Sequence, residues 1–145
     1  MTSIRLSILA LSALAIATAC GDPTDQLPVP GDTIPPVVTG LEPPPGSQGV
    51  DVTAVITVRF SEPINPATVG PASFVVVKGF DPVTGAYAFD DSTASFVPDD
   101  DLAYLGSFAV TLTRGIRDPA GNQLVRDTAW AFQVRGQGTP APARR

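Results

Sequence analysis

The sequence contains no histidine and only one cysteine, one methionine and one tryptophan in 145 residues. Histidine is the side chain that most readily serves as a general base near neutral pH, and it is the commonest protein ligand of metals. A single cysteine cannot form a disulfide within the chain or build a thiolate metal cluster. These absences argue against an enzyme, against a transition-metal site and against a disulfide scaffold.

Positive charge is also scarce. Nine lysines and arginines stand against 14 aspartates and glutamates, which gives a net charge of −5 at pH 7. Arg5 is the only charged residue among the first 20, so the chain from residue 20 onward carries 8 basic and 14 acidic residues, a net charge of −6. Such a surface repels the phosphate backbone of nucleic acids, and we expect no nucleic-acid partner.

The first 20 residues have the pattern of an export signal. After Arg5, residues 6–19 carry no charge, and they end in the small residues "ATA" directly before Cys20. This run is shorter than the roughly 20 apolar residues that cross a bilayer. A basic start followed by an apolar segment and small residues is typical of a secretory signal peptide.

The stretch "IATAC" resembles the lipobox of bacterial lipoproteins, although this chain has Ala17 where the family usually has Leu. The resemblance implies that residues 1–19 are a cleaved signal peptide and that a lipid on Cys20 anchors the chain to the membrane surface. The alternative is an ordinary signal peptide that leaves Cys20 as a free thiol, a liability in an oxidising exterior. Gly21 follows the cysteine, where enteric lipoproteins kept at the inner membrane have Asp. This favours the outer membrane or cell surface where a host has two membranes.

Both ends of the remaining chain have the composition of unstructured segments. Residues 20–35 are rich in Pro, Asp and Gly and predict a tether, and residues 136–145, "GQGTPAPARR", predict a disordered tail. Residues 36–135 are left to form a single folded domain.

The central hundred residues show alternation and no convincing helical periodicity. Apolar side chains alternate most clearly at 54, 56, 58 and 60, at 108, 110 and 112, and at 130, 132 and 134. This period indicates strands with one buried face. Weaker strand candidates are residues 37–41, 74–78, 83–89 and 93–97, and Pro-, Gly- and Asp-rich turns separate them. About seven short strands predict an all-β fold, an antiparallel β-sandwich with Trp130 in its core.

Three motifs follow one another in this region: "FSEP" at 60–63, "DPAGN" at 118–122 and "WAF" at 130–132. In this order, within residues 35–134, they resemble the SbsA-type bacterial Ig-like domain of S-layer and other bacterial surface proteins. The resemblance implies an immunoglobulin-like fold with a structural or adhesive role. Family members usually carry a tyrosine near the start of the penultimate strand. This chain has Ser107-Phe108 there, so a tyrosine-corner hydrogen bond is lost or relocated.

Calcium is the one ligand that the acidic loops predict, because hard cations take several oxygen ligands. Glu62, Asp118 and Asn122 lie in loops that can meet at one end of a sandwich. The alternative is that Asp118 and Asn122 serve only their own turn. Asp99–Asp101, with Asp90–Asp91 nearby in sequence, is a second acidic cluster. Its simpler interpretation is a solvated loop that deters edge-to-edge aggregation.

No catalytic residues are predicted. Ser61 and Glu62 are adjacent, but the following Pro63 indicates a loop rather than a catalytic pair. Three aromatic residues in the middle hairpin are candidates for a glycan or protein contact, or else cover the core: Phe80, Tyr87 and Phe89.

Taken together, these features predict a non-enzymatic lipoprotein, exported and anchored to the bacterial cell envelope through Cys20. It presents one Ig-like domain for envelope structure, or for interaction with a protein or glycan of the envelope. The alternative is an accessory module that binds a glycan or calcium.

Overall fold

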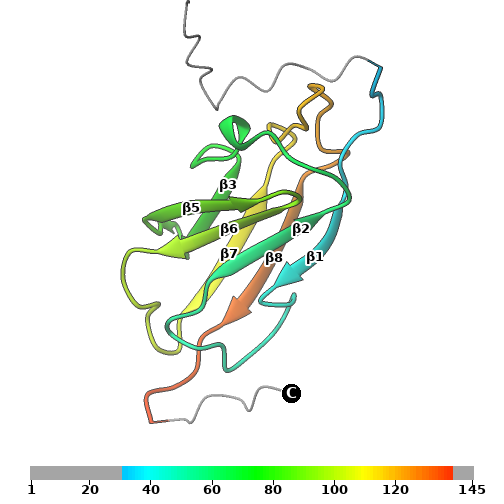
Figure 1. Ribbon diagram of the computed structural model, residues 1–145. Coiled ribbons are helices and arrows are strands. Elements are labelled where there is room, and N and C mark those ends of the chain that lie inside the picture. The colour runs from blue at the N-terminus through cyan, green and yellow to red at the C-terminus, as the bar shows by residue number, and fades with distance from the viewer. Residues whose placement is uncertain (1–30, 139–145) are drawn as a thin grey trace, which may run out of the picture.

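Two antiparallel sheets of four strands each form the part of the chain that the computed structural model describes, residues 31–138 (Figure 1). The strands are β1 (Val38–Glu42), β2 (Ile56–Phe60), β3 (Phe74–Lys78), β4 (Asp81–Pro82), β5 (Gly85–Asp90), β6 (Thr93–Pro98), β7 (Ser107–Leu112) and β8 (Thr128–Gln133). One sheet has the order β1-β2-β6-β5 and the other the order β4-β3-β7-β8. The predicted signal peptide, Cys20 and most of the predicted tether and tail lie outside the described residues. Within those residues, no helix has the length and apolarity needed to cross a bilayer.

The predicted alternation is confirmed in the three segments where it was clearest. The buried side chains are Ile56, Val58 and Phe60 in β2, Phe108, Val110 and Leu112 in β7, and Trp130 and Phe132 in β8. Burial of each contributes about 1.5–3 kcal/mol to folding, so the apolar face of each strand fixes which side turns inward. The all-β sandwich predicted from the sequence is therefore the observed fold.

The other strands lie within two residues of the predicted bounds, but two short elements were not predicted. β4 has only two residues, and it pairs with β3 across the turn at Gly79 and Phe80. A 3-10 helix, η1 (Pro66–Thr68), begins where the Asn65 side chain accepts a hydrogen bond from the Ala67 N–H. Both elements are too short to show a period in the sequence.

An aromatic cluster joins the two sheets. Phe74 of β3 lies 5.9 Å from Tyr87 of β5 and 6.1 Å from Phe96 of β6, measured between ring centroids. The Tyr87 hydroxyl donates a hydrogen bond of 2.9 Å to the Phe74 carbonyl, and burial raises the pKa of this hydroxyl. A tyrosine-to-backbone hydrogen bond is thus present, supplied by β5 rather than by the penultimate strand.

Trp130 is buried, as predicted, although it belongs to the edge strand β8. Its Nε1 donates a hydrogen bond of 3.0 Å to the Pro43 carbonyl, which ties the end of β1 to β8. The loop after Pro43 then runs along the second half of β8. Hydrogen bonds from the Gly46 N–H to the Ala131 carbonyl and from the Gln133 N–H to the Ser47 carbonyl cover that half of the strand edge.

Candidate functional site

Three carboxylates meet at the end of the sandwich where the described chain enters. Oxygen atoms of Asp32, Glu62 and Asp118 all lie within 4.8 Å of one another. Asp32 precedes β1, Glu62 follows β2 and Asp118 follows β7, and the antiparallel pairing brings these three positions to the same end. Figure 1 shows the start of the described chain, in blue, beside the orange loop between β7 and β8 at the top of the molecule.

Asp118 is the buried member, with 1% of its surface exposed. Its two carboxylate oxygens accept hydrogen bonds of 2.8 Å from the backbone N–H and from the side-chain Nδ2 of Asn122. Gly121 has a positive φ of 97°, which lets the turn close with its N–H on the Asp118 carbonyl. Asp118 and Asn122 therefore do build the turn, which is the simpler role that the sequence left open.

Asn122 also holds the chain entry. Its Nδ2 lies 3.3 Å from the Asp32 carbonyl and 3.4 Å from the Ile34 carbonyl. Asp32 is fixed further by its own Asx turn, in which Oδ1 accepts a hydrogen bond of 2.9 Å from the Ile34 N–H. Asn122 thus positions the cluster through its amide nitrogen, while Asp32 supplies the third carboxylate.

Glu62 is the least satisfied of the three. Its Oε1 is buried and has no hydrogen-bond partner among the described residues. Burial raises the pKa of this carboxyl, and the negative charges of Asp32 and Asp118 raise it further. Arg117, next to Asp118 in the sequence, donates from its guanidinium to the Gly121 carbonyl at 2.9 Å, and within residues 31–138 no salt bridge reaches the three carboxylates. The cluster therefore concentrates negative charge without a cation from residues 31–138.

Ser61, which precedes Glu62, has a structural role in the loop. Its Oγ accepts a hydrogen bond of 3.1 Å from the Val37 N–H, and its own N–H donates to the Val37 carbonyl at 2.9 Å. This exchange fixes the loop after β2 against the start of β1. It is the loop role that the sequence predicted for this serine.

The other candidates from the sequence do not join this site. In the described part of the chain, Asp99–Asp101 and Asp90–Asp91 belong to no group of carboxylates close enough to share an ion. Tyr87 packs between the sheets, while Phe80 and Phe89 are exposed. Phe80 follows β3 and Phe89 lies near the end of β5, so the pairing places them at opposite ends of the sandwich.

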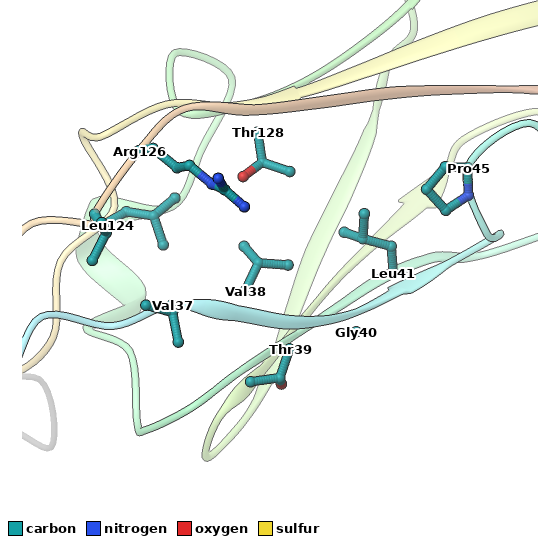
Figure 2. A pocket seen from close by; sticks show the side chains of 10 residues that line it. Val37, Val38, Thr39, Gly40, Leu41, Pro45, Leu124, Arg126 and Thr128 are labelled. Atoms are coloured by element: carbon teal, nitrogen blue, oxygen red, sulfur yellow. The ribbon is translucent and has the colours of Figure 1, made fainter.

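A groove between β1 and β8 is the feature that sequence reasoning missed altogether. It has a volume of about 470 Å³, and Figure 2 shows it open between the two strands. Its lining includes Val38, Leu41, Pro45, Leu124, Arg126 and Thr128. The lining comes from two segments about 85 residues apart (126 minus 41), and no local sequence pattern reports how far two sheet edges diverge.

The comparisons with known proteins agree with this fold. A family model described as a bacterial Ig-like domain matches residues 32–134. No curated protein matches the chain.

Solved structures with the same fold come from several kinds of protein. The N-terminal part of the bacterial S-layer protein SbsC is 21% identical, with a TM-score of 0.54 over 76% of this chain and 25% of that chain. CopC from Methylosinus trichosporium OB3b is 12% identical, with a TM-score of 0.55 over 72% of this chain and 98% of that chain. The LD transpeptidase LdtMt1, in complex with imipenem, is 16% identical, with a TM-score of 0.53 over 69% and 40%. The chain spans a quarter or less of the SbsC chains, and identities this low show a shared fold alone.

Proposed function

Because the chain belongs to the bacterial Ig-like domain family, we propose that it is a non-enzymatic module of the bacterial cell surface that acts in envelope structure or protein interaction. The observation that carries this proposal is the family match, which spans residues 32–134 and so takes in nearly all of the described chain. The fold shared with an S-layer protein supports a surface setting, and the acidic, histidine-free composition argues against catalysis.

The proposal includes a lipid anchor on Cys20, supported by the "IATAC" sequence. Cys20 precedes the first described residue, Gly31, by 11 positions (31 minus 20). An extended Pro-rich tether of that length reaches about 34 Å at 3.1 Å per residue. The tether joins the domain at its carboxylate end, where the chain enters.

Metabolic labelling with palmitate tests the anchor. The full chain is expected to take up label and to be processed, whereas Cys20→Ala loses both. Asp22→Asn, which keeps the cysteine, serves as the matched control and retains the label. Uptake of label by Cys20→Ala would contradict the lipid anchor. Surface exposure is tested by adding protease to intact cells that carry the unmodified chain, and resistance of the domain to that protease would contradict it.

A second candidate function is calcium binding at Asp32, Glu62 and Asp118. The unpartnered Oε1 of Glu62, beside two other carboxylates within 4.8 Å, favours it. Calcium takes carboxylate and backbone oxygens, and the Asp32 segment and the 118–122 turn present both kinds. A bound cation would offset the repulsion among the three charges and fix the chain entry to the sandwich. Thermal melts with calcium and with EDTA test this candidate.

A further inference from the structure

The groove lies at the seam where the two sheets meet edge to edge. β1 and β8 are edge strands of different sheets. Two hydrogen bonds bridge this seam, one from the Val125 N–H to the Pro36 carbonyl at 3.3 Å and one from Trp130 Nε1 to the Pro43 carbonyl at 3.0 Å. Between these two bridges β1 and β8 do not pair, and the groove of about 470 Å³ opens there.

Apolar side chains make up most of the groove lining. In Figure 2, Val38 and Leu41 point from β1 toward the side of the groove that carries Arg126 and Thr128. Two aliphatic residues of the lining are themselves exposed: Val37 at 41% and Val125 at 51%. Exposed aliphatic side chains that line a concave site favour an interaction surface over ordinary scatter.

Both strand edges also turn backbone groups toward the seam. The Phe60 N–H donates to the Ser92 carbonyl beside β6, so Val38, which lies opposite Phe60, directs its backbone groups away from β2. On β8, the backbone groups of Ala131 and Gln133 bond to the loop that follows Pro43. Because backbone direction repeats every two residues along a strand, the backbone groups of Ala129 point to the same edge. These groups can bind the main chain of an extended peptide, as in strand addition.

The edge of β1 limits what such a peptide can be. The pairing of β1 with β2 shifts between Val38 and Gly40, which is a bulge. A bulge bends an edge strand and interrupts any ladder built on it. A second copy of β1 therefore cannot form a long continuous sheet here, and a short segment fits better.

The charge of the groove points to the chemistry of its occupant. Arg126 is the one charged residue of the lining, on a chain whose net charge is −5. A positive side chain beside an apolar groove, on an otherwise acidic molecule, selects a partner that brings a carboxylate.

We propose that this groove binds a short extended segment of a partner polypeptide, with apolar residues at alternate positions and an Asp or Glu side chain that pairs with Arg126. The proposal rests on the proposed role in protein interaction and names the surface that performs it. The groove runs beside the chain entry, so the partner lies along the flank of the sandwich.

Two matched probe peptides test the proposal with the full chain. Each has nine residues in which threonine and valine alternate, and the central residue is glutamate in one and lysine in the other. Fluorescence anisotropy is expected to show the glutamate peptide binding about tenfold more tightly than the lysine peptide, and Arg126→Glu is expected to reverse that preference.

Arg59→Glu is the control. It makes the same change of net charge on the neighbouring strand β2, and Arg59 does not line the groove but a separate hollow with Glu42 and Thr57. The preference is expected to persist in this variant. Equal binding of the two peptides by the unmodified chain, or an equal response of the two variants, would overturn the proposal. Because the assay needs no lipid, such a failure would leave the palmitate test of the surface anchor unaffected.

Discussion

The carboxylate end and the β1–β8 groove are built in opposite ways. At the carboxylate end, Asn122 and the backbone hold Asp118 and Asp32 through short internal hydrogen bonds, and the chain entry is fixed there. In the groove, two strands are bridged only at its ends, the exposed Arg126 lies beside partly buried apolar side chains of β1, and only Leu124 of the lining is fully buried. The carboxylate end therefore supports the fold of the domain, and the groove offers a surface to a partner. Changes at the carboxylate end should therefore alter stability, and a change at the exposed Arg126 of the groove should alter binding alone.

Asp118→Ala is expected to have the largest effect on stability. It removes the acceptor of the Asn122 N–H and the shortest acceptor of Asn122 Nδ2, which keeps only longer bonds to the Asp32 and Ile34 carbonyls. Relief of charge repulsion with Glu62 offsets part of this loss, and we expect a net destabilisation of about 2 kcal/mol. Urea unfolding measures it. Asp99→Ala, on an exposed loop, is the control and should stay within about 0.5 kcal/mol. If the two variants lose the same free energy of unfolding, the stabilising role assigned to Asp118 is wrong.

Calcium is expected to stabilise the carboxylate end by a smaller amount. A ligand that binds only the folded state at ten times its dissociation constant adds about 1.4 kcal/mol. Melting curves in calcium and in EDTA measure the gain. Glu62→Gln should abolish it, and Asp99→Asn should retain it. If millimolar calcium leaves the melting temperature of the unmodified chain unchanged, calcium binding at this end is wrong.

The pH dependence of Glu62 gives a still smaller effect in the absence of calcium. The raised pKa means that the folded state holds this proton more tightly than the unfolded state does. The resulting stabilisation is present below the ordinary value of 4.5 and is lost as the pH rises through the raised pKa. Glu62→Gln cannot lose a proton, so its stability relative to the unmodified chain should increase across that window. If the difference in unfolding free energy between Glu62→Gln and the unmodified chain stays constant with pH, the pKa of Glu62 is the same in the folded and unfolded states.

Arg126→Glu is expected to have the least effect on stability, within about 0.5 kcal/mol, because Arg126 is exposed. The same variant reverses the peptide preference described above. Urea unfolding of the variant checks the first statement. A loss comparable to that of Asp118→Ala would show that the groove supports the fold.

The fold was largely predictable from the sequence because its buried faces follow the strand period. Ile56, Val58 and Phe60 alternate without interruption, and burial of such a face leaves one choice of register. β5 was harder to interpret, because Tyr87 turns inward among small and exposed neighbours. Its partners, Phe74 and Phe96, lie on other strands, so the sequence around Tyr87 contains no sign of them.

The candidate site was predictable only where its residues lie in recognisable loops. Glu62 and Asp118 were selected for their positions after strands, and the structure brings them together. Asp32 was placed in the tether because its neighbours are Pro- and Gly-rich, and what brings it to the site is a long-range bond from Asn122. The groove depends on the divergence of two sheets, which is set by packing rather than by any local pattern.

The most direct test of the division between the two regions is a map of backbone amide chemical shifts of the full chain as the glutamate peptide is added. We expect chemical-shift changes confined to residues 37–45 and 124–130, with the amide shifts of Glu62 and Asp118 unchanged. Changes centred on Glu62 and Asp118, or no changes at all, would contradict it.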